Sequence, residues 1–350
     1  MSDRLDGTDP ERPDGVDDGR SMLQDALDRQ SSGGRHAAGP ARTERARVGR
    51  ATRTPPPPLS VGRWIVRGVG ELLITVGLVL VLLVVYEVYV TDWFGARKQA
   101  VATEQLDTRW ERSGPAVVTV PGSGGGSVPG PSGSATPAPP VTPGEQVDPA
   151  TRTKRYDTVV GEGFAKIYVP SFGTDYVFTV IEGTDPDDLY IGPGHYEGTQ
   201  YPGQPGNFAV AGHRVSKGSP FNDLDLVQAC DSIVVETQDD WFVYRVLPMQ
   251  DEAATWNAAA HAHCTGVPKP GGAYAQVFGR TIVQPTDGAV VFPVPGSNSN
   301  AVPADAERLI TLTTCHPQFS DAQRMIIHGA MVASYAKSSG FRPPELDAES

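Results

Sequence analysis

One uncharged stretch most constrains what this chain can fold into. Leu72 to Tyr86 is a run of 15 residues without a charge, and the wider range 69–90 is interrupted only by Glu71 and Glu87. A helix needs about 20 apolar residues to cross the roughly 30 Å of a bilayer. The two glutamates would lie near the interfaces, where a charge costs less than at the centre. We therefore predict a single membrane-spanning helix over residues 64–93.

The flanks of this helix predict its orientation. Residues 42–67 contain seven arginines and one acid, Glu44, whereas the far side offers only Arg97 and Lys98 close to the helix. The excess of cations marks the cytoplasmic side, so the N-terminus is expected in the cytoplasm and residues beyond 91 outside the cell membrane. The apolar run begins some 60 residues from the first residue, unlike a cleavable signal peptide. A buried helix of a soluble domain would have a similar composition, but these flanks offer no core around it.

Composition divides the rest of the chain into segments. We predict a disordered cytoplasmic tail over 1–63, because this part has few large apolar side chains to offset its ordering entropy. The polar segment over 94–112 is predicted to form a short stalk. Residues 113–150 are rich in Pro, Gly and Ser and read as a linker, with a flexible reach of roughly 35 Å. A folded domain is expected over 151–338, followed by a polar tail over 339–350.

The folded domain has the pattern of an all-β protein. Apolar and β-branched runs recur between turn residues and predict eight short strands, with little helical pattern between them. Such a series favours a closed barrel or a sandwich. The predicted strands are Phe164–Val169, Tyr176–Ile181, Asn207–Ala211, Ser232–Thr237, Trp241–Leu247, Thr281–Val283, Arg308–Thr314 and Met325–Val332.

Charge and cysteine content exclude two classes of protein. The chain has 29 Lys and Arg against 41 Asp and Glu, a net charge of −12, which argues against a general nucleic-acid binder. Three cysteines are too few for a disulfide scaffold, although an exported domain would usually oxidise a pair of them. Cys230 and Cys264 lie in loop-like sequence, whereas Cys315 ends a predicted strand.

Three residues at strand ends could form a catalytic site. A nucleophilic cysteine needs a base or a cation close by, because an ordinary thiol is mostly protonated at pH 7. His213 also follows an apolar strand, and Arg324 begins the strand after Cys315, nine residues later. The three would meet at one rim if the strands align. From spacing alone, a buried cysteine, a capped histidine and a surface arginine remain an equal alternative.

These motifs resemble those of a known family. Thr311-Leu312-Thr313-Thr314-Cys315, Arg324 and the earlier Gly212-His213 resemble the sortase signature. The continuation His316-Pro317 and the run 205–214 are similar to class E sortases of actinobacteria, as is the run Gly70–Thr75 within the predicted membrane anchor. The resemblance covers about 156–335 and the membrane anchor.

The resemblance implies a fold and a reaction. The fold would be a closed eight-stranded β-barrel with short helices, and the activity that of a cysteine transpeptidase. We expect no cofactor and no metal. Cys315 would attack the Thr–Gly bond of a Leu-Ala-x-Thr-Gly sorting signal on secreted proteins and form a thioacyl enzyme. His213 would act as acid and then base, and Arg324 would hold the substrate and the oxyanion. The acceptor would be an amine of a peptidoglycan precursor of the lipid II type.

Two departures from the family pattern stand out. Cys230 replaces an expected turn glycine, and the stretch from 249 to 279, which contains Cys264, has no counterpart in the family pattern. A Cys230–Cys264 disulfide would explain both and leave Cys315 free. A metal site at His261, His263 and Cys264 lacks the paired spacing of structural zinc sites. The acidic turn at residues 185, 187 and 188 could offer oxygens to calcium but is more simply a solvated turn.

Two further interpretations stay open at this point. A pilin-polymerising sortase would transfer the protein to a lysine side chain of another protein, and a non-catalytic wall-binding module could keep the fold without the reaction. The family topology places substrate selection in the loop 286–306. Phe292 and Tyr274 could contribute there or could equally be core aromatics.

Overall fold

A computed structural model describes residues 61–86, 91–113, 143–152, 156, 158–260, 262–269 and 271–347. Residues 1–60 of the predicted tail and most of the predicted linker over 113–150 lie outside these residues, as does His261. The last three residues of the predicted tail, 61–63, belong to the first helix. The last residues of the predicted C-terminal tail also lie outside them.

The apolar stretch forms one long helix. α2 spans Val61–Val85, and all its apolar side chains are exposed. The helix is long and apolar enough to cross a membrane. At 1.5 Å per residue it measures about 37 Å, which exceeds the roughly 30 Å hydrocarbon core. The helix ends before the predicted boundary at residue 93, because Trp93 already belongs to the next helix.

Within the described residues nine strands form one sheet. Most of them match the runs of apolar and β-branched residues in the sequence. Their bounds are β1 Gly163–Tyr168, β2 Val177–Glu182, β3 Gly194–His195, β4 Gly206–Ala211, β5 Ser232–Glu236, β6 Asp240–Val246, β7 Arg280–Val283, β8 Arg308–His316 and β9 Gln323–Ala336.

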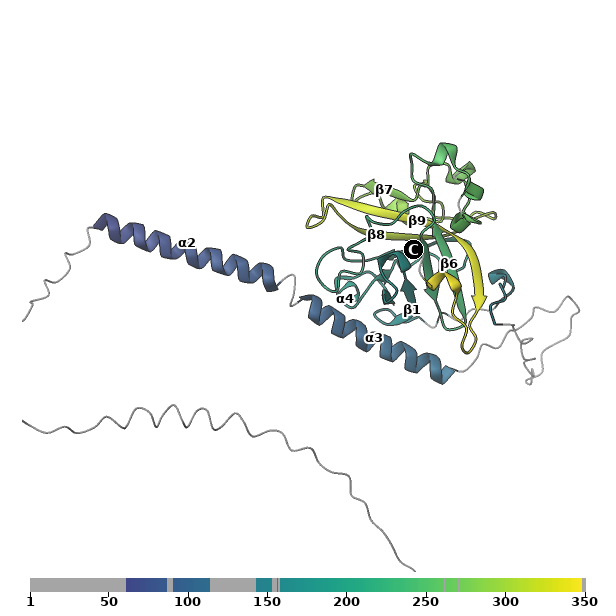
Figure 1. The fold of residues 1–350 in the computed structure, drawn as a ribbon, viewed down its shortest axis with the longest axis horizontal. Coiled ribbons are helices and arrows are strands. Elements are labelled where there is room, and N and C mark those ends of the chain that lie inside the picture. Colours follow the sequence, from purple (N-terminus) through teal and green to yellow (C-terminus); the bar gives the residue numbers. More distant parts are fainter. Residues whose placement is uncertain are drawn as a thin grey trace, which may run out of the picture. The chain divides into compact units, whose positions relative to one another are not determined.

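Eight of these strands close into a barrel, which confirms the predicted fold. The order β6-β5-β1-β2-β3-β4-β8-β9 becomes a ring because β6 also pairs with β9, from Asp240 opposite Ala336 to Val246 opposite Gly329. β7 pairs with the first part of β9, outside the ring. Figure 1 shows β8 and β9 as the long neighbouring strands of this barrel. Closure removes the unpaired edges that an open sheet would expose.

Two details of the barrel differ from the sequence prediction. β3 has only two residues, which is too short to produce an alternating pattern, yet it links β2 to β4 in the ring. β9 continues to Ala336, four residues beyond the predicted end, because its second half pairs with β6.

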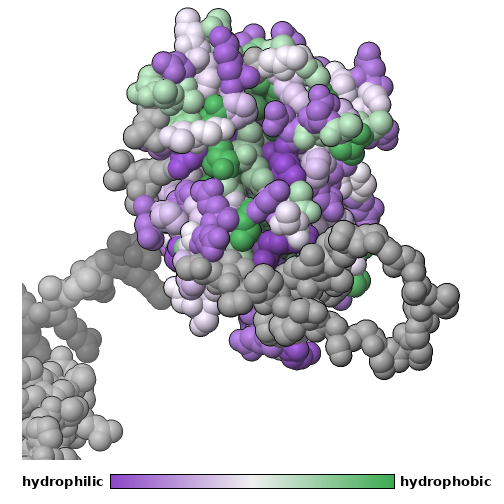
Figure 2. Space-filling view, turned by 90° about the vertical axis from the view of Figure 1, so that its right-hand side faces the viewer, coloured by the Kyte–Doolittle hydropathy of each residue, from purple (hydrophilic) through white to green (hydrophobic). Residues whose placement is uncertain are grey.

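The interior of the barrel is a continuous apolar core. Its large, fully buried side chains include Phe208, Phe221, Phe242 and Tyr244. On the face drawn in Figure 2, apolar areas lie between polar ones.

Short helices and turns connect the strands. α4 covers Pro186–Leu189, and Asp185 and Asp188 form its capping box, so two acids of the predicted solvated turn serve the local fold. The remaining short helices are 3₁₀ turns at Pro149–Thr151, Pro170–Phe172, Ala253–Thr255, Ala258–Ala260, Ala262–Cys264, Gly272–Tyr274, Gly288–Val291 and Pro344–Leu346.

The segment expected to be a stalk is a helix that packs on the barrel. α3 spans Thr91–Ser113, and its buried face contacts β1 and β2. Gln99 donates from Nε2 to the carbonyls of Thr179 and Ile191, both at 3.1 Å, and Leu106 is only 1% exposed. Its buried residues recur every three or four positions, but they are mostly small or polar: Thr91, Gly95, Gln99, Ala102 and Leu106. A search for an apolar stripe therefore misses this docking face.

The described end of the predicted linker also lies on the barrel. The Val147 amide donates to the Ser334 carbonyl at 2.9 Å, and Ser334 Oγ donates to the Val147 carbonyl at 2.5 Å. The barrel is therefore contacted both by α3, which precedes residues 114–142 in the sequence, and by the segment that follows them.

The stretch 249–279 packs against the barrel through a second core. This core contains the Cys230–Cys264 disulfide, with a Cα–Cα distance of 5.0 Å, together with Leu247, Val267 and Leu309. Cys230 has a φ of 71°, the left-handed conformation for which the sequence pattern led us to expect glycine. Cys315 is the free cysteine. The predicted disulfide is confirmed.

Removing this disulfide should lower stability and leave the chemistry intact. The double variant Cys230→Ala/Cys264→Ala opens a loop of 34 residues, for which chain entropy gives a loss of about 3–4 kcal/mol. We expect Tm to fall by roughly 5–15 °C in a thermal melt. Alkylation of the unreduced wild type should label one thiol. Labelling of all three, or an unchanged Tm in the double variant, would contradict this account.

Candidate active site

The strands β4, β8 and β9 bring three sequence-predicted residues to one rim of the barrel. β4 and β8 are parallel, with Ala211 opposite Thr313, and β8 and β9 are antiparallel. The end of β4, the end of β8 and the start of β9 therefore meet at the same edge of the sheet.

Cys315 and Arg324 lie directly opposite each other on the adjacent strands β8 and β9. Cys315 is the penultimate residue of β8, and Arg324 is the second residue of β9. They form one pair of the β8–β9 register. Directly opposed residues in an antiparallel pair have Cβ atoms about 4.5–5.5 Å apart on the same face of the sheet. Both are partly exposed, so a substrate can reach them.

His213 follows the neighbouring strand, two residues past the end of β4. The Gly212 amide donates to the Thr313 carbonyl at 3.0 Å, and Thr314 Oγ1 donates to the Gly212 carbonyl at 2.8 Å. These bonds continue the parallel register and bring His213 level with Cys315. Gly212 also lies close against Phe221, since a Cβ at this position would be 2.4 Å from the Phe221 ring.

The imidazole of His213 is held in its neutral form. Burial lowers the pKa of His213 to about 4, and the positive charge of Lys217 lowers it further in the same direction. Its Nε2 is buried and has no hydrogen-bond partner among the described residues. A buried imidazole nitrogen without a partner can accept a proton or a hydrogen bond from a reacting group.

The guanidinium of Arg324 is anchored by its own hairpin. Its Nη1 donates to the carbonyls of Asp321 at 2.9 Å and Gln323 at 3.0 Å. A guanidinium has five N–H donors, so Nε and Nη2 can serve a substrate oxygen. The two backbone bonds fix the direction of the remaining donors.

The structure adds a side-chain link that the sequence did not reveal. Arg214 is 5% exposed and donates from Nη1 to His316 Nδ1 at 2.9 Å, while its Nη2 forms an ion pair with Asp225 at 3.1 Å. Arg214 follows His213, and His316 follows Cys315. The link therefore joins the residues next to the imidazole and next to the thiol. The only sequence signal was the adjacency of these two residues to the predicted pair.

A buried polar chain supports the strands beneath the rim. His328 Nδ1 donates to Thr311 Oγ1 at 2.8 Å, and Thr311 donates to Asn207 Oδ1 at 2.7 Å. Burial lowers the pKa of His328 to about 4 and keeps it neutral. Asn207 Nδ2 in turn donates to the Phe292 carbonyl at 3.1 Å, which connects the loop 286–306 to β4.

The other residues considered from sequence lie elsewhere. Cys264 forms the disulfide with Cys230, and His263 is exposed in the 249–279 stretch. Tyr274 packs in the second core, where its hydroxyl accepts the Glu307 amide at 3.0 Å. Phe292 is half-buried.

A thiol, an imidazole and a guanidinium at one rim of a closed β-barrel are the groups that a cysteine acyl transferase requires. Comparison with known proteins agrees with this class. The family model described as Sortase domain matches residues 167–332. SrtF sortase from Corynebacterium diphtheriae is 42% identical, with a TM-score of 0.50, and the match covers 58% of this chain and all of that one.

Two curated relatives come from Streptomyces coelicolor. Sortase SrtE1 is 27% identical over 281 residues, which are 78% of this chain and 59% of the relative. Sortase SrtE2 is 27% identical over 282 residues, or 79% of this chain and 85% of the relative. This chain therefore spans less than two thirds of SrtE1. The chain belongs to the sortase family, whose members are cysteine transpeptidases.

Proposed function

We propose that this protein is a membrane-anchored transpeptidase that cleaves a Leu-Ala-x-Thr-Gly-type signal between Thr and Gly. It then transfers the acyl part to an amine of a peptidoglycan precursor. The observation that carries the proposal is the register pair of Cys315 with Arg324, with His213 at the end of the adjacent parallel strand. The choice of this signal rests on the resemblance of the motifs around His213 and Cys315 to class E sortases.

The first half-reaction forms a thioester. His213 accepts the thiol proton of Cys315, and the thiolate attacks the Thr carbonyl carbon. Arg324 donates to the oxyanion that develops on the carbonyl oxygen. When the intermediate collapses, the C–N bond breaks and the imidazolium of His213 gives its proton to the leaving glycine amine. The acyl group stays on Cys315.

The second half-reaction reverses these roles. The acceptor amine attacks the thioester carbonyl, His213 takes a proton from the nitrogen, and the Cys315 thiolate leaves. One amide bond is broken and one is formed, so the thioester conserves the acyl bond and no nucleotide is required. An amine in the peptidoglycan precursor would make the product a wall-linked protein.

The location proposed for this reaction follows from α2 and its flanks. The arginine-rich side of α2 would lie in the cytoplasm and the barrel outside the cell membrane. Val85 and Thr91 are joined by five residues, which span at most about 22 Å. Since α3 is docked on the barrel, the reaction would take place close to the bilayer, where a lipid-linked acceptor resides.

The proposal is tested with the full chain in detergent micelles. A Leu-Ala-x-Thr-Gly peptide is incubated with it alone, with a peptidoglycan stem-peptide amine, or with a lysine-bearing pilin-type peptide, and products are identified by mass spectrometry. We expect cleavage between Thr and Gly and transfer to the stem-peptide amine. Transfer only to the lysine peptide would favour a pilin polymerase, and no cleavage of any peptide would overturn the proposal.

The lowered pKa of His213 predicts the acid limb of the pH profile. The reactive thiol–imidazole pair carries one proton, and it gains a second when the pH falls through the pKa of His213. The value of kcat/KM should therefore stay level from pH 7 to about pH 5 and fall near pH 4. Lys217→Ala removes one cause of the lowered pKa, so its acid limb should move to higher pH.

The control for this profile is Lys269→Ala, which removes an exposed lysine far from His213 in the 249–279 stretch. Its acid limb should coincide with that of the wild type. A wild-type midpoint between pH 6 and 7, or a Lys217→Ala profile that does not move, would contradict the predicted protonation state.

A further inference from the structure

The loop that directly follows His213 has an unusual backbone. Four successive residues, Ser216, Lys217, Gly218 and Ser219, have φ values of 57°, 54°, 81° and 40°. Residues other than glycine rarely adopt this left-handed conformation, and a run of them persists only where surrounding structure fixes it.

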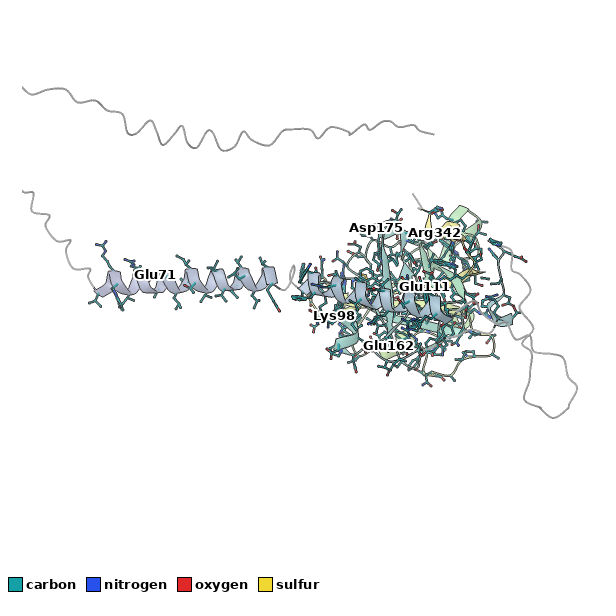
Figure 3. All side chains as sticks on the ribbon, turned by 90° about the horizontal axis from the view of Figure 1, so that it is seen from below. Glu71, Lys98, Glu111, Glu162, Asp175 and Arg342 are labelled. Atoms are coloured by element: carbon teal, nitrogen blue, oxygen red, sulfur yellow. A yellow bond between two sulfur atoms is a disulfide. The ribbon has the colours of Figure 1, made fainter. Side chains whose placement is uncertain are left out.

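The first turn of α3 supplies that support. Asp92 Oδ1 accepts the Gly218 amide at 3.0 Å. Gly95 is buried and touches the loop backbone, because a Cβ there would be 2.6 Å from the Lys217 carbonyl carbon and 2.8 Å from the Gly218 nitrogen. Figure 3 shows α3 across the barrel, with Lys98 near its beginning and Glu111 near its end.

A second contact joins the same two segments. The ammonium of Lys98 on α3 lies 3.9 Å from the centre of the Tyr190 ring, and that of Lys217 on the loop lies 5.9 Å from the same ring. Two cations on one aromatic ring connect helix and loop through electrostatic attraction.

Hydrogen bonds couple the position of this loop to the backbone of His213. The Phe221 amide donates to the His213 carbonyl at 3.0 Å, and Tyr176 Oη donates to the Pro220 carbonyl at 2.5 Å. Lys217 also lies near enough to His213 for its charge to act on the imidazole. A shift of Lys217 and Gly218 would therefore displace both the backbone and the charge next to the imidazole.

We propose that Asp92 and Gly95 are positioning residues for His213, and that the first turn of α3 forms part of the catalytic unit. This inference rests on the proposed function, since it requires His213 to act in transpeptidation. Asp92 and Gly95 precede His213 by more than a hundred residues, and the segment 114–142 separates them from it in the sequence. The helix that follows the membrane segment thus holds a loop of the candidate active site.

The test compares two aspartates on α3 in the full chain in detergent. Asp92→Ala removes the acceptor for Gly218, whereas the matched control Asp107→Ala removes the ion pair with Lys166, 2.6 Å long, at the other end of the helix. Asp92→Asn keeps an oxygen acceptor. For each variant we measure kcat, KM and Tm, with circular dichroism to verify folding.

We expect Asp92→Ala to lower kcat by roughly 10- to 100-fold with KM within about twofold of the wild type. Asp92→Asn should restore most of kcat, and Asp107→Ala should lower only Tm. Equal kcat values for Asp92→Ala and Asp107→Ala would overturn the inference, as would failure of Asp92→Asn to recover kcat. An inactive wild type would instead overturn the proposed function.

A glycine pair gives a second, independent comparison. Gly95→Ala places a Cβ against the loop backbone, whereas Gly70→Ala in α2 meets nothing within 4 Å. Both changes favour a helix. Gly95→Ala should lower kcat and Gly70→Ala should not. Wild-type kcat in Gly95→Ala would contradict a positioning contact at this residue.

Discussion

Cys315→Ala is expected to lower the rate of peptide cleavage and transfer by at least about 10⁴-fold, which is below detection in most assays. In the proposed mechanism the sulfur of Cys315 carries the acyl group between the two half-reactions, and alanine cannot form a thioester. Cys315 is only partly buried near the end of β8, so the substitution leaves no large cavity. Tm should remain within a few degrees of the wild type.

The double variant Cys230→Ala/Cys264→Ala is the matched control for this loss. It removes two cysteines in the second core and keeps Cys315, so its folded fraction should turn over peptide at the wild-type rate. Release of the glycine fragment by folded Cys315→Ala would show that another group carries the chemistry.

Arg324→Ala should lower kcat/KM by roughly 10²- to 10³-fold with folding preserved. Arg324 lies opposite Cys315 in the register, where its remaining donors can meet the oxyanion. Arg324→Lys should recover only part of the loss, because an ammonium keeps the charge but not the planar arrangement of donors. Steady-state kinetics with a fluorogenic Leu-Ala-x-Thr-Gly peptide measure both variants.

Arg342→Ala serves as the control for charge, since Arg342 is exposed near the C-terminal end of the described chain. We expect wild-type kinetics for it. An Arg324→Ala variant with unchanged kcat/KM would show that Arg324 has no part in the mechanism. Full activity of Arg324→Lys would show that only the positive charge is needed and not the planar arrangement of donors.

The strand pattern allowed much of the fold to be predicted. Apolar and β-branched runs between turn residues marked eight strands, and the hairpin between β8 and β9 follows from the nine-residue step between Cys315 and Arg324. Their pairing across the hairpin is confirmed by the register. Their catalytic roles, like that of His213, stay predictions until the variants are measured.

The parts that could not be predicted depend on contacts distant in sequence. β3 is two residues long and forms only because β2 and β4 flank it. The docking face of α3 consists of small and polar residues, so its affinity for the barrel comes from close approach and from the Gln99 hydrogen bonds rather than from hydropathy. The Arg214–His316 contact joins the loop after β4 to the last residue of β8, and these lie together only because β4 and β8 pair.

Mass spectrometry of the protein shows whether Cys315 carries the substrate as a thioester. The full chain is mixed with a Leu-Ala-x-Thr-Gly peptide without an acceptor amine, quenched in acid and digested to locate any adduct. We predict an added mass equal to the peptide up to Thr, on Cys315 alone, which disappears when the stem-peptide amine is added before quenching. Cleavage of the peptide without an adduct on Cys315, or an adduct at another residue, would exclude Cys315 as the acyl carrier.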